Sequence, residues 1–195
     1  MASLISVLQV LHILAALLMA WPFYALVAVN ERVRLGPPLG DRVDLYLENV
    51  VKGRVVPCFI LQATVMVSGV ALIFLHGLGL AGLLTNAALV AKFVLLLGIA
   101  GLLTYVHMGL QPRIDALFGD ALDSPTPPDV AAAIGTLRVR RKQLAAICLF
   151  CVLAMAMLGV QAWRPFPLWL TLALLAALAL FTLRAYRSTM PYGWA

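Results

Sequence analysis

Charged residues are scarce in this sequence: Asp, Glu, Lys and Arg make up 11% of its 195 residues, against about 25% in an average soluble domain. Hydrophobic residues make up 64%, well above the roughly 45–50% of soluble domains. A soluble globule of this length could not bury so much apolar surface, which excludes a water-soluble fold. The composition predicts an all-α, polytopic membrane protein that contacts a lipid bilayer.

Acidic residues are especially few, 8 against 14 Lys and Arg, and the formal net charge is +6. Binding to nucleic acid would require a basic face on a soluble surface. Here the basic residues lie mostly between apolar runs, so no nucleic-acid partner is expected. Cysteine is rare as well: Cys58, Cys148 and Cys151 are predicted to be buried thiols with a packing role.

Five apolar runs are long enough to cross a hydrocarbon core of ~30 Å. The first carries no formal charge and is too long for the apolar part of a signal peptide, so it is expected to remain as a helix. The length leaves room for the spans and their connections, which predicts a single transmembrane domain over residues 1–195. The predicted spans are residues 4–29, 55–75, 83–108, 144–163 and 166–183.

Short connections predict two helical hairpins. A glycine-rich turn separates the second span from the third, and the turn at 163–167 separates the fourth from the fifth. Pro165 and Pro167 suit the start of a helix, where the missing N–H would have no intrahelical partner. We therefore expect the second and third spans to pack tightly, and likewise the fourth and fifth.

The distribution of Lys and Arg predicts the orientation of the spans. Five basic residues lie in the loop 30–54, five in the loop 111–143 and two beyond residue 183, whereas the opposite side has Arg164 alone. Cytoplasmic loops carry the excess of basic residues. The amino terminus is therefore expected outside and the carboxyl terminus in the cytoplasm, in a bacterial inner membrane.

Both long loops contain segments with helical character. Residues 41–55 mix charges with apolar residues at helical spacing, which predicts an interfacial amphipathic helix. After a proline-rich stretch the second loop reads as a helix, with Asp129 near its start, that continues into the fourth span. Near the start of that span lie Arg138, Arg140, Arg141 and Lys142, which we expect to anchor the chain to anionic lipid headgroups.

Polar residues inside spans are costly, and each is a functional candidate. His12 lies about eight residues from the outer end of the first span, and Lys92 about as far from the outer end of the third. At ~1.5 Å per residue both lie roughly 12 Å deep, so they can meet. His76 is near the same surface, whereas His107 lies some 20 Å from the level of His12 and cannot share an iron with it.

Structural roles compete with these functional ones. His12 could simply bond a group on a neighbouring helix, and Lys92 could extend its ammonium to the outer headgroups. His107 is expected at the interface and His76 in a turn. If the site is functional, Lys92 is its candidate catalytic residue, His12 and His76 its cofactor-binding residues, and His12 its metal ligand.

The segment LHILAALLMAWPF at 11–23 resembles the first helix of a group of bacterial membrane proteins. The group includes the copper-resistance protein D family, the HemJ-type protoporphyrinogen oxidases and a related family of unknown function. The last of these matches best over residues 5–160, although Pro22 follows Trp21 here and a fifth span is added. The matching positions are His12, Glu31-Arg32, Gly69, Gln111-Pro112-Arg113 and Arg140-Arg141.

The resemblance implies haem b, because a first-helix histidine and a third-helix lysine characterise the HemJ-type proteins, which bind it. His12 and Lys92 would take those roles in redox or tetrapyrrole chemistry. Two alternatives stay open: a non-catalytic accessory subunit of a larger respiratory or photosynthetic membrane complex, and a copper or small-solute transporter. Whether the chain is an enzyme is left open as well.

Overall fold

The computed structural model describes residues 2–30, 48–50, 52–53, 55–119, 127–162 and 164–187. All regular structure in these ranges is helical. Five of the helices are long and apolar enough to cross a membrane, which confirms the expected all-α class and the number of spans. The five are α1 (Ala2–Asn30), α3 (Val55–Leu75), α5 (Ala87–Tyr105), α7 (Pro128–Gln161) and α8 (Leu168–Arg187).

The third span begins later than predicted, because the glycine-rich connection folds into a short helix, α4 (Gly79–Thr85). Asn86 then caps α5, with its side-chain oxygen accepting from the backbone N–H of Ala88 at 3.0 Å. The expected tight hairpin between the second and third spans was therefore wrong. Instead α3 packs mainly against α1, and α5 packs mainly against α7.

The third span also continues further than the apolar pattern predicted. After α5 the chain enters a π-helical turn, η2 (Val106–Leu110), and then α6 (Gln111–Gly119). π turns interrupt helices frequently at functional sites. Here η2 joins the apolar part of the span to a more polar segment, which carries Gln111 and Asp115.

Helix α7 runs without a break from Pro128 into the fourth span, as its sequence predicted. Its 34 residues measure about 51 Å, so its first turns extend past a ~30 Å apolar core. It turns back into α8, whose first backbone donors bond the carbonyl of Pro167. The side chain of Gln161 donates to Thr171 Oγ1 at 2.9 Å and ties α7 to α8.

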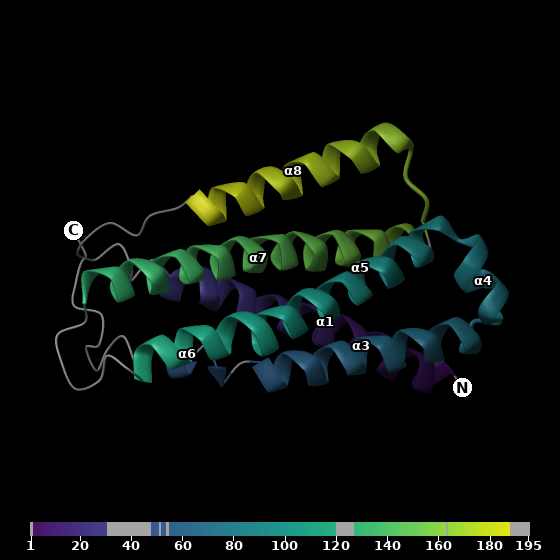
Figure 1. Ribbon diagram of the computed structural model, residues 1–195. Helices are drawn as coiled ribbons and strands as arrows, with labels where there is room; N and C mark the ends of the chain where they lie inside the picture. Colours follow the sequence, from purple (N-terminus) through teal and green to yellow (C-terminus); the bar gives the residue numbers. More distant parts are fainter. Residues whose placement is uncertain are drawn as a thin grey trace, which may run out of the picture.

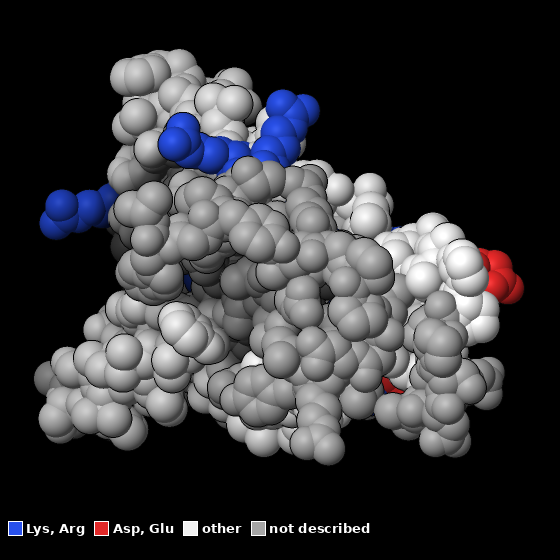
Figure 2. Space-filling model, turned by 90° about the vertical axis from the view of Figure 1, so that its left-hand side faces the viewer, with Lys and Arg blue, Asp and Glu red and all other residues white. Residues whose placement is uncertain are grey.

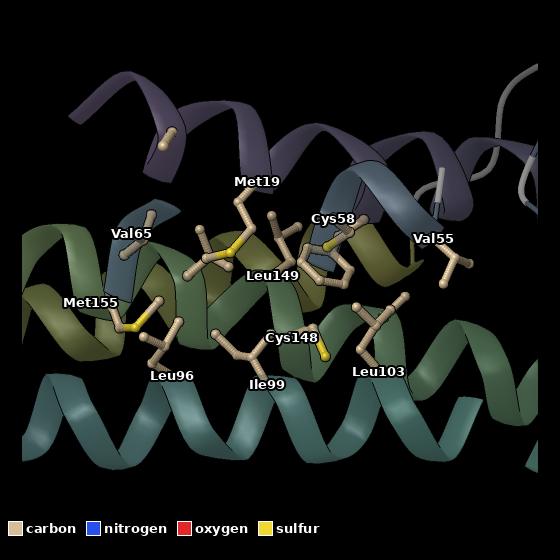
Figure 3. Packing of buried hydrophobic residues seen from close by; sticks show 14 residues of the cluster. Met19, Val55, Cys58, Val65, Leu96, Ile99, Leu103, Cys148, Leu149 and Met155 are labelled. Carbon is tan, nitrogen blue, oxygen red and sulfur yellow. The ribbon is translucent and has the colours of Figure 1, made fainter. Parts of the chain in front are cut away.

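Four helices surround the hydrophobic core, and α7 is central among them. It contacts α1, α5 and α8, whereas α8 lies on the outside of the bundle (Figure 1). Met19 of α1, Cys58 of α3, Ile99 of α5 and Leu149 of α7 all lie within one buried cluster (Figure 3). The outer surfaces of the spans remain apolar and exposed, as contact with lipid requires.

The two ends of the bundle differ in charge. We call the end that holds α6 and the start of α7 the basic end. Figure 2 looks at it, and shows Lys and Arg side chains projecting from its upper and left edges, with acidic atoms toward the right. Most of the amphipathic segment predicted at 41–55 lies outside the described residues, apart from 48–50, 52–53 and Val55.

Candidate functional site

The imidazole of His12 is held by a hydrogen bond between two helices. Its Nδ1 lies 2.9 Å from Oγ of Ser68 on α3. The Ser68 hydroxyl donates to the backbone carbonyl of Thr64 at 2.5 Å, so its oxygen is left to accept from His12. With Nδ1 as the donor to Ser68, Nε2 keeps a lone pair for a ligand. The ring also makes a hydrogen bond to the backbone of Val65.

The same ring packs closely against Gly69. A Cβ atom built at this glycine would lie 3.1 Å from Cε1 of His12 and 3.6 Å from its Nδ1. The ring would have to shift if residue 69 had a side chain. Gly69 thus leaves the space that the imidazole of His12 occupies.

Lys92 has a similar position against a second glycine. A Cβ atom built at Gly159 of α7 would lie 3.2 Å from Nζ of Lys92. Within the described ranges no acceptor bonds this ammonium, and no carboxylate pairs with it. An unpaired ammonium is costly at this depth, so Lys92 is available to an anionic group.

The packing of the core places His12 and Lys92 near one another. Val65, Leu96 and Met155 meet at one end of the core (Figure 3). Gly69 and Gly159 lie four residues after Val65 and Met155, and Lys92 lies four residues before Leu96 on the antiparallel helix. His12 packs on Gly69. The charge of Lys92 acts on the His12 imidazole. We call His12, Ser68, Gly69 and Lys92, with Gly159, the His12 site.

The other two histidines lie away from this level. His76 stands in the turn after α3, seven residues beyond Gly69, or about 10 Å along the helix axis. Its Nδ1 donates to the carbonyl of Leu72 at 2.8 Å. His107 is exposed in η2 near the basic end, where its ring makes an edge contact with Phe59, 6.4 Å between centroids.

The side chain of Gln62 on α3 is buried in the core. It is 5% exposed, and its Nε2 makes no hydrogen bond to any residue that the structure describes. A buried amide without a partner costs about 1–3 kcal/mol. Gln62 lies six residues from Ser68, between the His12 site and the basic end.

Of the three thiols that were predicted to be buried, Cys58 and Cys148 are buried and Cys151 is partly exposed. Cys148 and Cys151 are three residues apart on α7, and Cys148 is close enough to Cys58 of α3 for an electrostatic interaction. All three cysteines are free. Among the described residues, no three His, Cys, Asp or Glu side chains are arranged to hold a metal ion.

A second polar site lies at the basic end. Glu48 is 2% exposed and Arg141 is fully buried. Arg141 binds both carboxylate oxygens of Glu48, with 3.1 Å from Nη2 to Oε2. Arg138 donates to the same Oε2 at 3.2 Å. Paired arginines around one carboxylate form charge-assisted bonds, which are stronger than neutral ones.

Gln111 completes this arrangement, which we call the Glu48 cluster. Its Nε2 donates to Glu48 at 2.8 Å, and its Oε1 accepts from Arg141 at 2.8 Å. Gln111 also donates to Asp115 at 3.1 Å, and Asp115 pairs with the half-exposed Lys52 at 2.7 Å. The cluster joins the chain before α3 to the third and fourth spans.

The Glu48 cluster corrects the lipid-anchor prediction for residues 138–142. Arg138, Arg141 and Lys142 are buried, and Lys142 lies over the ring of Tyr186 at 5.1 Å. Only Arg140 of these four basic residues is exposed. Positions 138, 141 and 142 share one face of a helix, whereas 140 faces away, so helical periodicity could have separated them.

Sequence reasoning missed Glu48 as a site residue, because a glutamate in a charged loop normally faces solvent. Gln111 and Arg141 did stand out as parts of short motifs, and the structure joins them directly. Gly69 and His12 stood out in the same way and are packed together. Comparisons with protein-family models, curated proteins and solved structures found no match.

Proposed function

We propose that this membrane protein binds b-type haem at the His12 site, where Nε2 of His12 would hold the iron and Lys92 would pair with a propionate. The observation that carries the proposal is the bond from His12 Nδ1 to Ser68. Histidines that bind metals typically donate the other ring N–H to an oxygen, which fixes their orientation.

Lys92 gives a second reason to propose that haem binds at this site. Its ammonium has no described partner and lies near Gly159, and a carboxylate in this apolar region would form a charge-assisted bond with it. Haem b offers an iron for the imidazole and carboxylates for the ammonium. The group would supply one-electron chemistry when bound. His76, at the end of α3, stays a predicted binding residue at the edge of this site.

Absorption spectroscopy tests the proposal. The wild-type chain, purified in detergent and titrated with haem, should show a Soret band and b-type bands on reduction. His12→Ala should abolish them while circular dichroism shows an unchanged helical content. His107→Ala is the matched control and should keep the spectrum, since His107 lies at the other end of α5. A wild-type chain that stays colourless with excess haem overturns the proposal.

Lys92→Met separates the two roles in the site. The change keeps much of the volume and removes the charge, so the iron ligand remains while the propionate loses its partner. Haem should still bind, with a changed reduction potential. An unchanged potential would show that Lys92 does not face the cofactor.

The proposed orientation places the basic end in the cytoplasm of a bacterial cell, because basic residues concentrate there. Reporter fusions at Leu122 and after Arg187 should then report a cytoplasmic location, and a fusion at Gly77 an external one. A periplasmic signal from the fusion after Arg187 would contradict this topology.

One feature favours an accessory subunit as a second candidate function. Gly98 and Gly101 lie on an exposed face of α5, and a Cβ atom built at either would meet nothing within 4 Å. Small residues allow close contact between helices in membranes. If this face binds a larger complex, Gly98→Leu should abolish stoichiometric copurification, while Ala176→Leu on exposed α8 should not.

A further inference from the structure

Arg140 differs from the other basic residues at the start of the fourth span. It is exposed, whereas Arg138 and Arg141 bind Glu48 inside the bundle. Its guanidinium carbon lies 5.6 Å from the centroid of the Tyr105 ring on α5. This cation–π contact holds the guanidinium in place at the junction of α5 and α7.

The charge of Arg140 has no counterion among the described residues. Within the described parts of the chain no carboxylate pairs with it, and no acceptor bonds its nitrogen atoms. A guanidinium presents five N–H donors in a planar fork that matches a phosphate. The nearby carboxylate of Glu48 is bound by Arg141, Arg138 and Gln111.

The residues around Arg140 and Tyr105 are apolar and exposed. Met108 in η2 is 73% exposed, and Val139 and Ile147 of α7 are each 49% exposed. Tyr105 is 42% exposed and presents a ring and a hydroxyl, as aromatic residues do at the level of the headgroups. The Glu48 cluster includes Arg141, the next residue in α7, and lies where the apolar core ends.

We propose that Tyr105 and Arg140 form a binding site for an anionic phospholipid. The guanidinium binds the headgroup phosphate through two N–H donors, and the acyl chains lie along the exposed apolar surfaces of α5 and α7. Charge complementarity favours an anionic lipid over a zwitterionic one, because no carboxylate of the described ranges pairs with the guanidinium of Arg140. The site is independent of haem binding at the His12 site.

Native mass spectrometry of the detergent-purified protein tests this site. Titration with phosphatidylglycerol should populate a one-lipid state at lower concentration than titration with phosphatidylcholine. Arg140→Gln should weaken phosphatidylglycerol binding about fivefold, the order expected for one basic residue at an anionic membrane surface. Arg113→Gln, which removes an exposed charge from α6, should bind like the wild type.

Two further measurements identify what the site binds. Tyr105→Leu should weaken the same binding, because the guanidinium loses the ring that holds it, while Tyr105→Phe should behave like the wild type. Millimolar inorganic phosphate should not displace the lipid, since it lacks acyl chains. Equal phosphatidylglycerol binding by the wild type and Arg140→Gln, equal binding of both lipids, or displacement by phosphate would each overturn the proposal.

Discussion

Ser68 on α3 holds the imidazole of His12 on α1, with 2.9 Å between Oγ and Nδ1. The bond joins two of the most closely packed helices of the bundle. The Ser68 hydroxyl donates to the carbonyl of Thr64, so its oxygen can accept the Nδ1 proton of His12. Ser68 therefore helps to position the imidazole of His12.

Replacing Ser68 with alanine should weaken haem binding by about 10–100-fold, the usual effect of losing a group that orients a metal-binding histidine. The measurement is a haem titration followed at the Soret band. Thr104→Val is the matched control, since the Thr104 hydroxyl bonds the carbonyl of Ala100 in its own helix. Equal losses in both variants would point to a general effect of removing hydroxyls from the spans.

Gly69→Val should disturb the site without touching any polar group. A Cβ atom at position 69 would already lie 3.1 Å from the His12 ring, and valine adds two methyl groups. Overpacking of this kind costs about 1–3 kcal/mol in the free energy of unfolding. We expect a weakened or shifted Soret band in haem titrations and an earlier unfolding midpoint in a denaturing detergent.

The control for this change is Gly98→Val, because the space around residue 98 is open. It should keep the wild-type spectrum and unfolding midpoint. If Gly69→Val also leaves the Soret band unchanged, the close contact between Gly69 and His12 has no bearing on cofactor binding.

The number of spans could be predicted from the sequence because apolar runs of this length have few alternatives. The start of α5 could not be predicted in this way, because it depends on two local features. Asn86 caps the helix, and α4 occupies the preceding connection. Asparagine is a preferred capping residue, but glycines in 77–82 gave a stronger signal for a simple turn. The predicted hairpin failed for this reason.

Depth along each helix brought His12 and Lys92 to one level, since the rise per residue is constant. Which side chains face each other across helices depends on rotation and packing, and a single sequence does not determine these. Glu48 illustrates the difficulty. It lies 93 residues before Arg141, its partner, and nothing local to either residue indicates the pair.

Glu48→Gln should destabilise the fold strongly. The change leaves Arg138 and Arg141 buried beside a neutral amide, and breaking a buried ion pair in this way costs about 3–5 kcal/mol. Unfolding by a denaturing detergent, followed by circular dichroism, measures the loss. Lys52→Gln removes a half-exposed partner of Asp115 and should cost at most about 1 kcal/mol. Similar midpoints for the two variants would show that the Glu48 cluster contributes little to stability.

Gln62 gives the sharpest distinction between a structural and a functional role. Its side chain is buried in the core and its Nε2 bonds no described residue, so Gln62→Met, of similar volume, should stabilise the protein by about 1–3 kcal/mol. A rise in the unfolding midpoint with an unchanged haem titration would mean that the amide has no part in the His12 site. A rise in stability together with weaker haem binding would show that the amide is retained for a ligand, because polar groups inside spans mark functional sites. A fall in the midpoint would contradict the prediction.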